Sequence, residues 1–168
     1  MTITTVGIDL AKNVFAVHCV DQNGKTVLVK SRVTRAALPG LIAGLPPCVI
    51  GMEACSGAHY WARLFRQYGH EPRLMAAKFV SPYRMAGKND AAAADAQAIC
   101  EAVRRPHMRF VPVKDESQQA MQCLHRTRQG FIEEKTATYN RLRGLISEFG
   151  VIAPQSTDAL RHIVFEQK

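Results

Sequence analysis

The chain has 168 residues, of which 47% are hydrophobic and 21% charged, and this length is enough for one buried core and a small appendage. It contains no apolar run of the roughly 18 residues that span a membrane, and no signal-peptide pattern, so we expect a cytoplasmic protein rather than a membrane protein. The net charge is +8, and the whole excess lies within residues 1–114, as is typical of proteins that bind a polyanion.

The cysteines and histidines show no metal-binding pattern. The five cysteines include no CxxC pair, and the six histidines include no HxxxH pair. This pattern favours small buried thiols in a reducing compartment over disulfides or a zinc site. We assign none of these residues to a metal.

The first part of the chain predicts a three-stranded antiparallel meander. Residues 3–9 and 14–20 are rich in Val, Ile and Thr, and a third apolar run follows at 26–29. Asn23 and Gly24, between the second and third runs, form a strong hairpin signal. We therefore expect three consecutive strands that pair as neighbours.

Helices and strands alternate in the middle of the chain. Apolar residues at helical spacing follow Thr34, which we interpret as an N-cap, and Pro46-Pro47 ends this helix. The expected elements, in chain order, are a helix at 34–45, a strand at 48–52, a helix at 56–68, a strand at 72–76, a polar basic connection at 78–88, an alanine-rich helix at 90–105 and an extended piece at 109–113.

This order of elements is typical of a ribonuclease-H-like α/β fold, in which helices flank a mixed sheet. The strand at 48–52 follows a helix, so a right-handed crossover would place it parallel to the strand at 3–9. If these two strands are neighbours, Asp9 and Glu53 lie at the same edge of the sheet, where open α/β sheets place their functional sites.

Four acidic residues are the candidate catalytic and metal-binding residues. Asp9 and Glu53 end two apolar runs, and Asp90 and Asp95 stand out from an alanine-rich stretch. Carboxylates from separate elements are suited to Mg²⁺, and two such ions can catalyse reactions at a phosphodiester. Structural alternatives remain open: an exposed strand-end acid for Asp9, a cap of the helix near Ser56 for Glu53, an N-cap for Asp90 and a surface acid for Asp95.

Six basic residues are candidate contacts to nucleic-acid phosphates. Two precede the acidic pair in the basic connection, one follows Asp9 closely, and three lie at or beyond the end of the alanine-rich helix, where basic residues also stabilise ordinary helices. These candidates are Lys12, Arg84, Lys88, Arg104, Arg105 and Arg109.

Residues 115–150 are predicted to form one long helix, or two helices with a break near Gly130. Its apolar residues follow a near-heptad spacing, so we expect the seam to pair with a partner helix from a second copy, the alternative being a helix folded back on its own domain. The seam consists of Met121, Leu124, Phe131, Thr138, Leu142, Leu145 and Phe149. Residues 151–168 are interpreted as a truncated tail with a short amphipathic piece.

The chain contains, in order, the stretches GIDLAKNVFAVHCVD, GMEACSGAHYWARLF, MAAKFVSPYRMAGKND and DAQAICEAVRRPHMRFVPVK. Together they resemble the N-terminal catalytic domain of DEDD-type transposases of the insertion-sequence 110 family, which includes the Piv-type DNA invertases. The resemblance implies a RuvC-like domain over residues 1–114 whose four acids bind Mg²⁺ or Mn²⁺ for DNA strand cleavage and exchange. Asp9 matches the family's first acid and Glu53 its second.

The resemblance also implies partners. DNA is the substrate, a structured guide RNA accompanies it, and residues 115–150 resemble the coiled-coil segment that assembles protomers into a homo-oligomer.

Two features depart from the family's pattern. The family's last two acids stand three residues apart, whereas Asp90 and Asp95 stand five apart and would point about 140° away from each other on an uninterrupted helix. Alignment from either side retains one of them, and we favour Asp95. Family members also continue into a second domain with a proposed serine nucleophile, and Ser156 lies in no matching motif. We therefore expect a domain that is incomplete alone, and an impaired site.

Three other hypotheses stay open. The first is a non-catalytic remnant that keeps nucleic-acid binding and dimerisation. The second is a plain four-way-junction resolvase. The third is an actin-like sugar kinase, although such proteins have a Gly-Thr-type turn where this chain reads DLAK.

Overall fold

The computed structural model describes residues 2–84 and 91–165. The chain divides into two compact units, Met1–Asp115 and Glu116–Lys168, which are described separately. Among the described residues, no helix combines the length and apolar character needed to cross a membrane.

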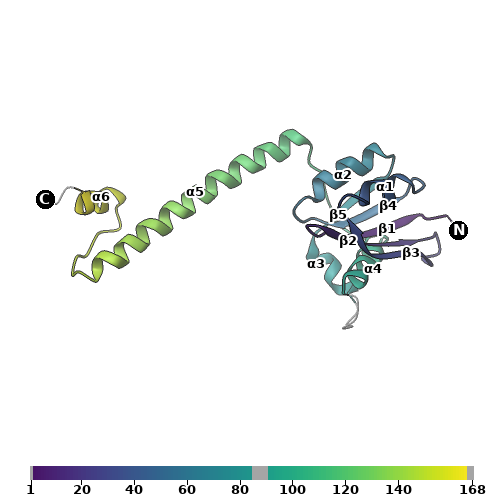
Figure 1. The fold of residues 1–168 in the computed structure, drawn as a ribbon, viewed down its shortest axis with the longest axis horizontal. Coiled ribbons are helices and arrows are strands. Elements are labelled where there is room, and N and C mark those ends of the chain that lie inside the picture. The colour runs from purple at the N-terminus through teal and green to yellow at the C-terminus, as the bar shows by residue number, and fades with distance from the viewer. Residues whose placement is uncertain (1, 85–90, 166–168) are drawn as a thin grey trace. The chain divides into compact units, whose positions relative to one another are not determined.

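The first unit is built on a six-stranded mixed sheet with the strand order β3-β2-β1-β4-β5-β6 (Figure 1). The first three strands pair antiparallel in sequence, β4 and β5 run parallel to β1, and β6 returns antiparallel beside β5. The strands are β1 (Thr5–Asp9), β2 (Val14–Val20), β3 (Thr26–Thr34), β4 (Val49–Glu53), β5 (Glu71–Met75) and β6 (Phe110–Val111). The predicted ribonuclease-H-like fold is confirmed, including the adjacency of β1 and β4.

The β2–β3 hairpin forms at the predicted Asn-Gly signal. Gly24 adopts a left-handed conformation with φ of 80°, which favours a residue without a side chain. The Asp21 carboxylate accepts hydrogen bonds from the backbone N–H groups of Asn23 and Lys25, both at 2.9 Å. These local bonds fix the turn that joins β2 to β3.

The helices follow the predicted order with two corrections. Thr34 is not an N-cap, because it ends β3 and the first helix begins at Leu38 after Ala37. The connection predicted at 78–88 contains a short α-helix and a 3₁₀ turn within its described part. The helices are α1 (Leu38–Ala43), α2 (Ala58–Gln67), α3 (Ala77–Val80), η1 (Ser81–Tyr83), α4 (Ala91–Val103), α5 (Glu116–Ser147) and α6 (Thr157–Phe165).

A large apolar core fills the space between α1, α2 and one face of the sheet. Phe15 of β2 contacts Trp61 of α2 edge-on with ring centroids 5.4 Å apart, and Trp61 stacks on Phe65 at 5.8 Å. On the opposite face, α4 packs against the sheet through smaller side chains such as Ala98 and Val103. The two faces of the sheet are therefore covered by helices of different composition.

The cysteines divide between the interior and the surface. Cys19, Cys48 and Cys100 are buried, and all five cysteines are free. Burial raises the pKa of the Cys100 thiol to about 12, so this thiol stays protonated and inert. The prediction of buried thiols is wrong for Cys55 and Cys123, which are exposed.

The second unit consists of two helices. α5 continues for 32 residues without a break, so the alternative of two helices separated near Gly130 is wrong. None of its residues is buried, and Leu124 and Phe131 of the predicted seam are 65% and 67% exposed. Arg143 of α5 donates to the carbonyl oxygens of Pro154 and Gln155. These bonds attach the segment between Gly150 and α6 to α5.

Candidate carboxylate site

The site forms where two strand ends and α4 meet on one face of the sheet. Side chains alternate along a strand, so Gly7 and Asp9 of β1 lie on the face opposite Val6 and Ile8. The parallel register places Gly51 beside Gly7, so Glu53 projects from the same face and the same edge as Asp9. The sheet itself therefore brings these two carboxylates together.

Two strand glycines allow α4 to approach that face closely. A Cβ atom on Gly7 would lie 2.2 Å from the Ala96 carbonyl oxygen and 2.5 Å from the Cys100 nitrogen. A Cβ atom on Gly51 would lie 2.8 Å from the Cβ of Val103. Any side chain at Gly7 would push α4 away from the sheet.

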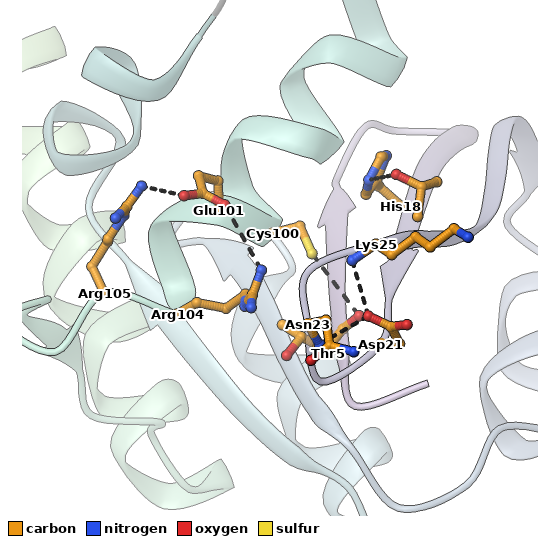
Figure 2. A network of polar contacts seen from close by, with 10 residues as sticks. Thr5, His18, Asp21, Asn23, Lys25, Cys100, Glu101, Arg104 and Arg105 are labelled. Carbon is orange, nitrogen blue, oxygen red and sulfur yellow. Dashed lines mark hydrogen bonds and ion pairs between the residues drawn. The ribbon is translucent and has the colours of Figure 1, made fainter. Parts of the chain in front are cut away.

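The consequence of this close approach is the position of Asp95. It precedes Ala96, the residue whose carbonyl touches Gly7, and so α4 carries the Asp95 carboxylate to the ends of β1 and β4. Further along the helix, the Cys100 Sγ lies 3.9 Å from the backbone oxygen of Thr5 on β1 (Figure 2). α4 thus packs against β1 between Ala96 and Cys100.

Arg84 links two of the three carboxylates. It follows η1 directly, its Nη2 donates to Glu53 Oε1 at 3.0 Å, and its Nε lies 2.9 Å from Asp95 Oδ1. Its side chain is 43% exposed, whereas that of Glu53 is 16% exposed. The guanidinium is therefore a cation held between the end of β4 and α4.

Asp9 interacts electrostatically with both Glu53 and Asp95. Burial is the main cause that raises the pKa of its carboxyl group, followed by the negative charges of Asp95 and Glu53, and Arg84 opposes the rise. Three carboxylates from β1, β4 and α4 thus interact at one edge of the sheet. A cation at this position would relieve their mutual repulsion.

The donor chemistry fits a hard divalent cation, but the side chains are not arranged around one. Mg²⁺ and Mn²⁺ prefer oxygen ligands, which these carboxylates provide. Within residues 2–84 and 91–165, no three His, Cys, Asp or Glu side chains are placed so that they hold a metal ion as they stand. Arg84 engages oxygens of two of the three acids, and Asp90 lies outside the described residues.

The purely structural roles considered for Asp9, Glu53 and Asp95 do not agree with their contacts. Glu53 does not cap α2, which begins after Gly57 without a side-chain cap. Asp9 is half-buried rather than an exposed strand-end acid. Asp95 is paired with Arg84 rather than pointing freely into solvent.

The predicted basic residues are spread over the unit. Lys12 is exposed in the turn after β1, close in sequence to Asp9, and Arg109 is exposed before β6. Arg104 and Arg105 lie just beyond the other end of α4, and both pair with Glu101 (Figure 2). Arg104 follows Asp95 by nine residues, which corresponds to about 13 Å along a helix axis.

Lys88 and Arg84 differ from the other predicted basic residues. Lys88 lies outside the described residues. Arg84 was predicted only as a phosphate contact, and its ion pairs with the acids were missed. The interior glycines of β1 and β4 were missed as well, although a glycine within a strand is a recognised signal of close backbone approach.

Comparison with known proteins now identifies the family. A family model for DEDD transposases of IS110 elements, described as a transposase, matches residues 6–150. The chain belongs to this DEDD transposase family. The IS110-family match therefore includes the sheet apart from Thr5, together with the carboxylate edge and α5.

Curated relatives support the same assignment. The chain is 49% identical over 153 residues to the "Probable family 20 transposase" of Pseudomonas aeruginosa, covering 91% of this chain and 44% of that protein. It is 41% identical over 161 residues to the transposase for insertion sequence element IS1328 of Yersinia enterocolitica, covering 96% and 47%. It is 40% identical over 149 residues to the transposase for IS1111A of Coxiella burnetii, covering 89% and 40%.

The IS110-family chain thus spans less than half the length of each of these relatives.

Proposed function

We propose that the first unit is the metal-dependent catalytic region of a DNA transposase, in which Asp9, Glu53 and Asp95 hold Mg²⁺ or Mn²⁺ for strand cleavage and exchange. The observation that supports this most is the meeting of these three acids, from β1, β4 and α4, in a chain of a DEDD transposase family. Asp90, which the resemblance offers as a fourth acid, stays a candidate ligand.

Each residue has a definite task in this proposal. The parallel pairing of β1 and β4 orients Asp9 and Glu53 toward one point, and α4 delivers Asp95 to them. A bound divalent ion supplies Lewis-acid catalysis, because it stabilises the charge that develops on phosphodiester oxygens. Without a cation, Asp9 retains its proton more readily than an ordinary aspartate.

The partners we propose are DNA and a structured guide RNA. The basic excess of residues 1–114 provides the electrostatic attraction, which acts on both polyanions. Lys12 is exposed beside the strand that ends in Asp9, and so it is placed to contact a phosphate near the acids. Arg84, Lys88, Arg104, Arg105 and Arg109 remain proposed contacts.

We propose further that α5 pairs with the same helix of a second copy. Its seam residues Met121, Leu124, Phe131 and Leu145 are between 56% and 67% exposed. An apolar stripe at near-heptad spacing is stable in water when another helix covers it.

A cation-binding experiment tests the proposed site. We expect the full chain to bind Mn²⁺ in isothermal titration calorimetry, and Asp9→Asn to lower the affinity at least about tenfold, because it removes a charged ligand. Glu71→Gln is the matched control, since Glu71 is an exposed acid of the same sheet that pairs with Arg73 at 2.8 Å. A Mn²⁺ affinity that Asp9→Asn leaves unchanged would contradict the proposal.

The non-catalytic remnant is the second candidate, and one observation favours it. No described group of three potential ligands is arranged to hold a metal as it stands, while the basic excess of residues 1–114 and the exposed α5 seam are both present. This candidate predicts that the chain binds DNA in a salt-dependent manner with the same affinity in Mn²⁺ and in a chelator.

A further inference from the structure

Arg84 is held in place from both of its ends. Its backbone N–H donates to the carbonyl oxygen of Ser81 at 3.2 Å, which closes the η1 turn, and its backbone then turns to an extended conformation. Its guanidinium reaches Glu53 at 3.0 Å and Asp95 at 2.9 Å. The side chain therefore connects three separate segments of the chain: the η1 turn, the end of β4 and α4.

The guanidinium engages two of the three carboxylates that a cation would need. Glu53 Oε1 and Asp95 Oδ1 each accept a charge-assisted contact from Arg84, so one oxygen of each acid is oriented toward the guanidinium and its positive charge occupies the space between them. Arg84 therefore performs part of the electrostatic task of a metal ion.

We propose that Arg84 is the built-in counter-ion of the carboxylate site: it holds Glu53 and Asp95 in the cation-free protein, and a divalent cation must displace it in order to bind. This inference rests on the proposed metal site. It identifies Arg84 as a positioning residue that competes with the cation, in addition to any contact it makes with a phosphate.

The competition has two measurable consequences. Removal of the guanidinium frees both acids, so the cation affinity should rise. It also leaves three carboxylates facing one another without compensation, so the cation-free protein should unfold at a lower temperature, and a saturating cation should restore more stability than it does in the wild type.

The experiment compares the full-length wild type with Arg84→Gln in Mn²⁺ titrations by calorimetry and in thermal unfolding with Mn²⁺ or a chelator. We expect Arg84→Gln to bind Mn²⁺ about tenfold more tightly, and to show a lower midpoint in chelator and a larger rise with Mn²⁺. Arg73→Gln is the matched control, because it makes the same charge change and breaks an ion pair with Glu71 elsewhere on the sheet.

Two further variants keep the inference falsifiable. Arg84→Lys keeps the charge but lacks the planar guanidinium, so its Mn²⁺ affinity should lie between those of the wild type and Arg84→Gln. If the glutamine variant does not fold, the lysine variant is used in its place. The double variant with Asp9→Asn should lose the gain, because the gain depends on the carboxylate site.

The outcomes separate this inference from the proposed function. If the wild type binds Mn²⁺ in an Asp9-dependent manner and Arg84→Gln binds with equal or lower affinity, the counter-ion role is wrong and the metal site stands. If neither protein binds Mn²⁺, the metal site is wrong and the counter-ion role fails with it.

Discussion

The two faces of the central sheet differ in the size of the side chains that cover them. The face under α1 and α2 is filled with large side chains, including Ile8, Phe15 and Phe65, and it provides most of the buried apolar surface. The face under α4 has glycine at Gly7 and Gly51, so the helix backbone itself lies on the strands. The first face stabilises the fold, and the second determines where the acids meet.

This division explains how the fold tolerates three carboxylates that repel one another. Three interacting carboxylates cost free energy, and burial of apolar side chains on the opposite face is the main source from which a small unit can offset such a cost. Mutations on the two faces should therefore separate stability from cation binding, and the following changes test this separation in order of expected effect.

The largest effect is expected on the α2 face. Phe65→Ala removes a fully buried ring that stacks on Trp61, and it should lower the free energy of unfolding by about 3–5 kcal/mol. Chemical denaturation followed by tryptophan fluorescence measures this loss. At temperatures where the variant is folded, its Mn²⁺ affinity should match the wild type, and a parallel loss of affinity would show that the two faces are not separable.

A smaller loss of stability but a clear loss of cation affinity is expected on the α4 face. The Cβ of Gly7→Ala would collide with the Ala96 carbonyl, so α4 must shift, at a cost of about 3 kcal/mol. The shift carries Asp95 away from Asp9, and calorimetry should detect weaker Mn²⁺ binding.

Gly40→Ala in α1 is the control for this substitution. A Cβ there meets no atom within 4 Å, so the variant should gain up to about 1 kcal/mol of stability and keep its cation affinity. If both alanine variants behave alike, close helix approach at Gly7 does not position the site.

The smallest effect is a dependence of stability on pH that arises from Asp9. Because the pKa of Asp9 is raised in the folded protein, the unfolded chain releases its proton first as pH rises from about 4. The free energy of unfolding should therefore fall as pH rises through the pKa of the folded state and then level off.

Asp9→Asn should remove this fall and make the cation-free protein slightly more stable than the wild type at pH 7. Denaturation curves in chelator between pH 4 and pH 7 measure the difference. Identical pH profiles for the two proteins would mean that Asp9 carries no unfavourable charge in the folded state. The same substitution is expected to weaken Mn²⁺ binding. Asp9 would therefore favour cation binding while it lowers the stability of the cation-free protein.

Much of the fold was predictable because the relevant signals are local. Strand runs, the Asn-Gly hairpin and the alternation of helices with strands predicted the order of elements along the chain and the three-stranded meander, while the adjacency of β1 and β4 was expected by analogy with the ribonuclease-H-like fold. The predicted element bounds were wrong where one residue suited two kinds of structure. Thr34 suits both a strand end and a helix cap, and β3 extended far enough to include it.

The carboxylate site was predictable only in part. Asp9 and Glu53 stand at the ends of recognisable strands, so a parallel pairing was sufficient to bring them to one edge. The spacing of Asp90 and Asp95 indicated that at most one of them serves the site from an unbroken helix, and α4 includes Asp95. No pattern in the sequence indicated that Arg84 would contact two of these acids.

By itself, the sequence determined the element order, the strand-end acids, the basic excess and the apolar stripe of α5, because each depends on residues near one another in the chain. Only the tertiary structure decided that Asp95 reaches Asp9 and that Arg84 lies between Glu53 and Asp95. Those contacts depend on how closely α4 approaches the sheet, and that distance is set by two glycines on different strands together with the helix residues that face them.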